Sequence, residues 1–281
     1  MDNEEGRHEV TAMTMSNRLA ATTTCYAPYS LEEALAGIAA SGFRYVELAA
    51  IPGIIEHLPL AADARTIGRA QRLLNRYALT PVSLSAHSNL TTRRGLNQAR
   101  RALDLCERMG IPILNTAVGG PEAGEEDEEA FHANIGGLAD YAAERDVTIT
   151  LEIHGELTST GRKARTLVET VGRSNVRINY DTANCEYYGA VRAEADLPYA
   201  LPLVALCHLK DKVGGPGVWN FPALGSGHVD FAKLLHMLRR GGYRGPCCVE
   251  VEFQGHPWPP PAVVNRALKK SYKYLSSLGL S

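Results

Sequence analysis

The stretch VTITLEI at residues 147–153 is a short apolar run that lies between two longer amphipathic segments. The helical segment before it ends near Arg145, and the next helix is expected at about 162–172. The same alternation recurs along the chain in both directions. Strands that alternate with helices predict a parallel sheet.

Eight strand-like runs can be counted, each followed by a helical or partly helical segment. They lie at 19–24, 44–48, 81–86, 112–118, 147–153, 176–180, 203–209 and 247–252. The other helices are expected at about 30–42, 62–77, 92–109, 196–201, 229–240 and 262–278. Ser30 and Glu33 have the spacing of a capping box at the start of the first helix. Eight units in about 250 residues is the size of a closed (β/α)8 barrel.

An open doubly wound sheet is the alternative architecture, and its usual sign is a glycine-rich phosphate loop after the first strand. The corresponding segment here, TTTCYAPYS at 22–30, contains no glycine. We therefore predict a single (β/α)8 TIM barrel over residues 18–281, preceded by a flexible tail at 1–17. Met13 or Met15 is an alternative start. The Gly- and Pro-rich stretch 211–228 is expected to be an active-site loop.

Composition narrows the function classes. The chain has 281 residues, a formal charge of -2 and 45% hydrophobic residues, which is typical of a soluble globular protein. The near-zero charge argues against a nucleic-acid binder, and no apolar run approaches the roughly 18 residues of a membrane span. The N-terminus has no apolar signal-peptide core, so we expect a cytoplasmic protein. The six cysteines form no C-x-x-C pair, and most of them are expected to be small buried residues.

Ionisable residues gather at the expected ends of the strands, where barrel enzymes carry their chemistry. Four of them, from the last four strands, would supply three carboxylates and one imidazole: Glu152, Asp181, His208 and Glu250. A single strand-end carboxylate is often only a solvated residue, but four together suit a divalent ion such as Mn, Mg, Co or Zn. Their apolar contexts also favour this interpretation, because a buried charge needs a partner or a metal.

Five motifs occur in order along the barrel: LEIHGE at 151–156, NYDTAN at 179–184, CHLKD at 207–211, ALGSGHVDF at 223–231 and GPCCVEVE at 245–252. With them the chain resembles the sugar isomerase/epimerase superfamily of xylose-isomerase-like barrels, which includes ketose 3-epimerases and inosose dehydratases. The resemblance runs from about residue 19 to 275.

This resemblance implies that Glu152, Asp181, His208 and Glu250 are the ligands of one divalent metal, with manganese expected first and magnesium, cobalt or zinc as alternatives. It also implies that Glu152 and Glu250 flank the reacting carbon of a sugar, where one removes a proton and the other returns one. The metal would polarise a carbonyl and hydroxyl pair and stabilise an enediolate. Glu250 is preferred to Glu252 because it follows Gly245 by five residues, as in the family pattern.

Further mouth residues have open roles. His154 and Lys210 are candidate catalytic helpers, although His154 could instead hydrogen-bond a metal ligand and Lys210 could pair with a ligand carboxylate. His87, Glu47, Asn184 and Trp219 are candidate substrate contacts, and for Trp219 simple loop packing is the alternative. Asn115 could also bind a hydroxyl group.

Two departures from the wider family exclude one activity. Asn184 stands where several epimerases and the endonuclease IV proteins have a histidine. Trp219 and Phe221 stand where endonuclease IV proteins carry a D-x-H pair that feeds further metals. The side chains of Trp219 and Phe221 cannot bind zinc, so a trinuclear site and cleavage of abasic DNA are not expected.

The prediction is therefore a metal-dependent sugar isomerase or epimerase acting on a sugar or polyol, without nucleic acid or membrane. A lyase on the same metal site is the first alternative, either an inosose dehydratase-like enzyme or a deglycosidase subunit acting on 3-oxo-glycosides or C-glycosides. A non-catalytic sugar-binding barrel is the second. We expect a homo-oligomer, with a hetero-oligomer containing a second subunit as the alternative.

Overall fold

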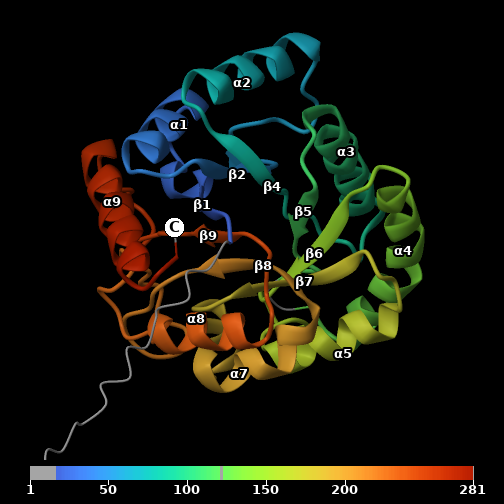
Figure 1. Cartoon of the computed structure of the whole chain (residues 1–281). Coiled ribbons are helices and arrows are strands. Elements are labelled where there is room, and N and C mark those ends of the chain that lie inside the picture. Colours follow the sequence, from blue (N-terminus) through green and yellow to red (C-terminus); the bar gives the residue numbers. More distant parts are fainter. Residues whose placement is uncertain (1–16, 121–122, 281) are drawn as a thin grey trace, which may run out of the picture.

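The computed structural model describes residues 17–120 and 123–280, and these form a closed barrel of eight parallel strands (Figure 1). The strands follow the order β1-β9-β8-β7-β6-β5-β4-β2, and β1 also pairs with β2, which closes the ring. The predicted (β/α)8 architecture is therefore confirmed. The barrel strands are β1 Leu19–Thr22, β2 Tyr45–Ile51, β4 Thr80–Ser85, β5 Ile113–Thr116, β6 Thr148–Glu152, β7 Val176–Asp181, β8 Val204–Leu209 and β9 Cys247–Val249.

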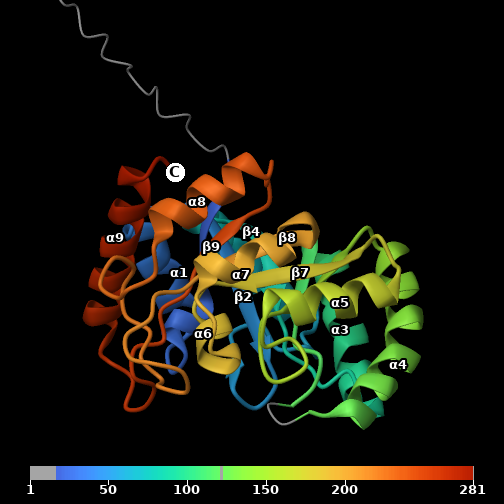
Figure 2. The same ribbon diagram turned by 90° about the horizontal axis from the view of Figure 1, so that it is seen from below.

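Helices surround the barrel and bury their apolar faces against the outer side of the strands (Figures 1 and 2). The first begins with the expected capping box, in which the Ser30 and Glu33 side chains each bond the other residue's backbone N–H. The helices are α1 Leu31–Ala40, α2 Ala64–Arg76, α3 Arg93–Met109, α4 Glu125–Ala143, α5 Gly161–Val171, α6 Asn184–Gly189, α7 Ala193–Ala200, α8 Phe231–Arg240 and α9 Pro261–Ser277.

The strand ends near the mouth differ from the sequence-based boundaries. β2 continues to Ile51, beyond the expected end at residue 48, and pairs with the short antiparallel strand β3 Ile55–Glu56 in a hairpin. β1 ends at Thr22, where the chain turns into a 3-10 helix at Thr23–Tyr26. β9 ends at Val249, although the N–H of Glu250 still donates to the carbonyl of Leu209 at 3.0 Å.

Side chains fill the interior of the barrel in layers. The lower layer, which is the one further from the C-terminal ends of the strands, is a small apolar cluster of Ala20, Val82, Ile113, Leu206 and Cys248. Because strand side chains alternate between two faces, the next inward position lies two residues further along each strand. On β8 and β9 those positions are His208 and Glu250, so the polar layer lies directly above the apolar one.

Three other expectations concern the chain as a whole. The predicted tail at 1–17 lies outside the described residues except for Asn17, which is buried and donates from Nδ2 to the carbonyl of Gly245 at 2.7 Å. All six cysteines are buried and free, as expected. In the part of the chain that the structure describes, no helix has both the length and the apolar character needed to cross a membrane.

Candidate metal centre and cavity

The four residues expected to hold a metal converge at the mouth of the barrel. Each offers one ligand atom, and these atoms all lie within 4.8 Å of one another. Glu152 and Asp181 end β6 and β7, His208 lies near the end of β8, and Glu250 directly follows β9. All four side chains are buried, so the parallel strands deliver a compact group of three carboxylates and one imidazole from four separate segments.

The imidazole of His208 turns one nitrogen toward this group and the other away from it. Nδ1 lies 3.5 Å from Glu250 Oε2, 3.6 Å from Glu152 Oε2 and 4.0 Å from Asp181 Oδ2. Nε2 lies 2.9 Å from Oε1 of Glu47, an ion-pair contact that is not aligned as a hydrogen bond. Burial alone would lower the pKa of His208, but the carboxylates of Glu47 and Glu152 raise it well above its usual value.

Glu47 does not reach the cavity, which corrects its expected role as a substrate contact at the mouth. Its side chain is fully buried, and its Oε2 accepts a hydrogen bond from Ser83 Oγ at 2.7 Å. The reason is the length of β2: because the strand continues to Ile51, Glu47 lies in its middle rather than at its end. Glu47 therefore supports His208 from below.

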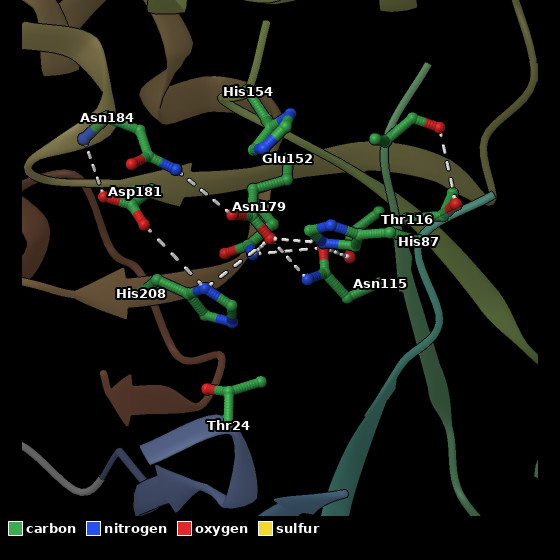
Figure 3. A network of polar contacts seen from close by, with 12 residues as sticks. Thr24, His87, Asn115, Thr116, Glu152, His154, Asn179, Asp181, Asn184 and His208 are labelled. Atoms are coloured by element: carbon green, nitrogen blue, oxygen red, sulfur yellow. Dashed lines mark hydrogen bonds and ion pairs between the residues drawn. The ribbon is translucent and has the colours of Figure 1, made fainter. Parts of the chain in front are cut away.

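The carboxylate of Glu152 is held by side-chain amides and an imidazole (Figure 3). Oε2 accepts from Asn115 Nδ2 at 2.6 Å and from Asn179 Nδ2 at 3.1 Å, and His87 Nε2 lies 3.1 Å away. Asn184 Nδ2 donates to Oε1 at 3.3 Å. Burial would raise the pKa of Glu152, but the nearby His208 and His87 lower it below its usual range. The carboxylate is therefore fixed in place and ionised.

On the other side of the mouth, Glu250 is held by a hydroxyl group and an ammonium group. Thr24 Oγ1 donates to Oε1 at 2.9 Å, and Lys210 Nζ donates to Oε2 at 3.0 Å. Lys210 also pairs with Glu252 and lies 3.8 Å from Asp181 Oδ2. Although burial opposes it, Lys210 lowers the pKa of Glu250 well below its usual value.

The balance of charge around the site fits a divalent cation. Even with both His208 and His87 protonated, the cluster holds five carboxyl groups against three positive groups, so acidic groups outnumber basic ones. Burial, together with Glu250 and Glu152 and against the effect of Lys210, raises the pKa of Asp181 to about 6. Its Oδ2 and the Nδ1 of His208 are buried without a hydrogen-bond partner, so both remain available as ligands. Mixed oxygen and nitrogen donors of this kind suit Mn, Mg, Co or Zn.

A cavity of about 400 Å³ opens directly above this centre. It reaches Glu152 and Glu250 but not the buried Asp181 and His208, which lie beneath its floor. The side chains of His87, His154, Asn184, Lys210 and Trp219 line it, so the structure brings these predicted residues together around one space. The ring of His154 contacts the hydroxyl of Tyr188, with Nε2 and the oxygen 2.9 Å apart. Burial lowers the pKa of His154 to about 4, which keeps its ring neutral at neutral pH.

The chain matches a known family model, the xylose isomerase-like TIM barrel, over residues 35–274. The chain belongs to the xylose isomerase-like TIM barrel family. This confirms the resemblance inferred from the strand-end motifs. Among curated members, the chain is 27% identical to an L-ribulose 3-epimerase of Methylomonas sp. (strain DH-1) over 237 residues, which is 78% of this chain and 77% of that protein.

Two solved structures share the fold. A D-allulose 3-epimerase from Methylomonas sp. in complex with D-allulose superposes with a TM-score of 0.72 and 21% identity, covering 95% of this chain and 99% of that one. The IOLI protein with a bound zinc atom gives a TM-score of 0.76 at 19% identity, covering 93% and 98%. In this xylose isomerase-like barrel, the parallel strands therefore have the arrangement known from both proteins.

Several residues around the centre were not anticipated from the sequence. Asn179 precedes Asp181 by two residues on the same inward face, so strand periodicity could have indicated it. Thr24 follows the first strand, and only the turn at Thr22 directs its hydroxyl to Glu250. Tyr188 lies on the unexpected short helix α6, and no sequence signal indicated its contact with His154.

Proposed function

We propose that this protein is a divalent-metal-dependent sugar isomerase or epimerase that transfers a proton next to a carbonyl group through an enediolate. The observation that carries the proposal is the placement of two ionised carboxylates, Glu152 and Glu250, on either side of one centre. They come from β6 and β9, which two other strands separate in the sheet. The epimerase names of the curated relatives support the same reaction class.

Glu152, Asp181, His208 and Glu250 would hold the metal, with manganese proposed first and magnesium, cobalt or zinc as alternatives. When bound, such an ion supplies Lewis-acid polarisation of the carbonyl and neighbouring hydroxyl and stabilises the negative charge that develops on their oxygens. The buried Glu47 keeps the metal-facing nitrogen of His208 directed at the centre, as the outer partners of metal-bound histidines do.

The proton transfer itself is assigned to the two glutamates. One carboxylate takes the proton from the carbon next to the carbonyl, and the electron pair of that C–H bond forms the enediolate double bond. The other carboxylate first takes a proton, which for Glu250 the ammonium group of Lys210 can supply, and returns it to the opposite face of the same carbon, which inverts its configuration. The side-chain amide of Asn115 donates to Glu152, and Thr24 and Lys210 each donate to Glu250. These hydrogen bonds hold both carboxylates in position for the transfer.

The cavity residues are assigned to the substrate. His87, Asn184 and Trp219 are proposed contacts for its hydroxyl groups and ring face, and His154 and Lys210 are proposed proton-handling helpers. The neutral ring of His154 has a buried Nδ1 with no hydrogen-bond partner, which supports a role as a hydrogen-bond partner for a substrate hydroxyl.

Metal analysis by mass spectrometry tests the centre directly. We expect about one divalent ion per chain in the purified protein, and its loss in both Glu152→Ala and His208→Ala. The matched control is Glu169→Ala, an exposed carboxylate on α5. Absence of metal even after reconstitution would refute the proposal and favour a non-catalytic sugar-binding barrel. Screening of ketoses and inososes in D2O then identifies the reaction, because an enediolate intermediate incorporates deuterium at the reacting carbon.

A lyase on the same centre is the second candidate. The observation that favours it is the His154–Tyr188 pair, because a hydrogen-bonded imidazole and phenol could protonate a leaving group. Elimination would begin with the same proton removal and end with loss of water or an aglycone. Product analysis by mass spectrometry separates the two reactions: an epimerase conserves the substrate mass, and a lyase does not.

A further inference from the structure

The loop at 211–228 begins with two consecutive charged residues that the metal centre does not use. Asp211 closes the CHLKD motif, and Lys212 follows it directly. Both side chains are fully buried, and neither lines the cavity. A buried charge must be offset by hydrogen bonds or by a partner of opposite charge, so the contacts of these two residues show what they hold in place.

The carboxylate of Asp211 fixes the base of the loop. Its Oδ1 accepts from the backbone N–H groups of Lys212 at 2.8 Å and Val229 at 3.2 Å. Its Oδ2 accepts from those of Ser226 at 3.1 Å and Gly227 at 2.7 Å. The segment that leaves β8 is therefore tied to the segment that enters α8.

The ammonium group of Lys212 fixes the tip of the same loop. It donates to a ring of four backbone carbonyl oxygens, those of Val213 at 3.2 Å, Gly214 at 3.3 Å, Gly215 at 2.9 Å and Val218 at 2.6 Å. An ammonium group has three N–H donors, so at least two of these carbonyls share one donor. Rings of backbone carbonyls bind K⁺ in channel proteins. Lys212 places a fixed positive charge in a ring of this kind.

The positive charge, and not only the volume of the side chain, is what this ring requires. Lys210 pairs with three carboxylates, whereas the described residues give Lys212 Nζ only carbonyl oxygens as hydrogen-bond partners. The loop closes on itself, because the N–H of Val213 donates to the carbonyl of Asn220 at 3.0 Å. Without the ammonium group, four carbonyl dipoles would point at one another inside this closed loop and lose their donor.

The tip of the loop is joined to the cavity through two aromatic residues. Trp219 directly follows the last carbonyl of the ring, and its side chain lines the cavity. The indole packs edge-on against Phe221, with ring centroids 5.0 Å apart, and the Phe221 ring centroid lies 4.5 Å from Lys210 Nζ. The N–H of Phe221 donates to the carbonyl of Phe253 at 2.7 Å, which attaches this end of the loop to the segment after β9. A shift of the loop tip would therefore move Trp219 while Phe221 stays attached beside Lys210.

We infer that Lys212 is a positioning residue of the substrate site: its ammonium group, held in the carbonyl ring, keeps Trp219 at the cavity. The inference rests on the proposed function, because it takes Trp219 as a contact for the ring face of the sugar. Lys212 does not line the cavity, so its effect on the reaction passes through Trp219.

A double-mutant cycle tests this on the manganese-loaded protein with the substrate found in the screen. Lys212→Met keeps the length of the side chain and removes its charge and its donors. It should raise KM about 2- to 10-fold and leave kcat unchanged, because a ring contact present in ground and transition states alike is lost. Trp219→Ala should have the same effect. The double variant should have the KM of Trp219→Ala alone, since residues that act through one contact are not additive.

Val213→Ser is the matched control, because its side chain is exposed on the same loop and does not line the cavity, and its carbonyl stays in the ring. It should leave KM at the wild-type value. An unchanged KM in folded Lys212→Met, a fall in its kcat, or single effects that multiply in the double variant would overturn the inference. If Lys212→Met does not fold, Lys212→Gln, which keeps N–H donors without the charge, replaces it in the cycle with the same expected outcome.

Limited digestion with chymotrypsin gives a readout that needs no turnover. Cleavage after Trp219, identified by mass spectrometry, should be faster in Lys212→Met than in wild type and Val213→Ser, because proteases cut segments that open locally. If a ketose is epimerised but cleavage and KM stay those of wild type, the proposed function stands and the inference fails. If no sugar is turned over, the proposed function fails, and cleavage after Trp219 alone decides whether Lys212 holds this segment.

Discussion

The lower and upper layers of the barrel interior lie on the same inward faces of the same strands, but they have opposite energetic roles. Leu206 and Cys248 pack in the lower layer, and two residues further along, His208 and Glu250 belong to the charged layer. Burying apolar area stabilises the fold, whereas burying an excess of negative charge destabilises it unless a cation is bound. Two residues along a strand thus separate the apolar layer that stabilises the barrel from the charged layer assigned to catalysis.

The largest expected effect is a loss of activity when Glu152, in the charged upper layer, is replaced. Glu152→Gln keeps the size of the side chain and removes its basic oxygen, so turnover should fall by about 10²- to 10⁴-fold while the circular dichroism spectrum stays unchanged. Steady-state kinetics on the substrate identified in the screen provides the measurement. Glu169→Gln, on the outer surface, is the control, and activity close to wild type in Glu152→Gln would contradict the assignment.

A cavity in the lower layer should have the reverse effect. Leu206→Ala removes a fully buried side chain, and the free energy of unfolding should fall by about 2 to 5 kcal/mol. Urea denaturation measures this loss. Metal content per folded chain should remain that of the wild type, since the residue lies below the centre; a loss of metal in the folded variant would show that the two layers are not separable.

The boundary between the layers is tested at Glu47. Replacement by Gln removes the charge next to His208 Nε2, and metal affinity should fall about 10- to 100-fold. Competition with a fluorescent chelator gives the dissociation constant. Ser83→Ala, which leaves the Glu47 charge and removes only its hydroxyl partner, should have a smaller effect. Equal losses in the two variants would mean that the hydrogen bond, not the charge, matters.

The smallest expected effect is a pH dependence of folding stability, caused by Glu252 beside the charged layer. Burial raises the pKa of Glu252 to about 7, even though the nearby Lys210 lowers it. In the unfolded chain this carboxyl ionises near its usual pKa of about 4.3. Its folded form therefore prefers the proton, so its contribution to stability is fully present at low pH and is lost as the pH rises toward 7.

Comparison of wild type with Glu252→Gln isolates this contribution. Metal-free wild type should lose stability relative to the variant as the pH rises from about 4.5 to 7. Thermal unfolding at several pH values measures it. A constant difference across this range would contradict the raised pKa.

Much of the upper layer follows from residue spacing alone. The carboxyl ends of parallel strands meet at one end of a barrel, so one charged residue near the end of each of the last four strands was enough to predict a common site. The same rule misplaced Glu47, because it depends on knowing where a strand ends. β2 runs three residues beyond the expected boundary, and that extension turns a predicted substrate contact into a buried support for His208.

The sequence by itself therefore determined the (β/α)8 architecture and the set Glu152, Asp181, His208 and Glu250, because strand and helix periodicities are local properties of the chain. Only the tertiary structure decided what surrounds that set: the amides of Asn115 and Asn179, the hydroxyl of Thr24, and the cavity that Ile54 and Trp219 help to line. These contacts join segments far apart in the chain. Their geometry depends on strand register and on the paths of the loops, which no local pattern encodes.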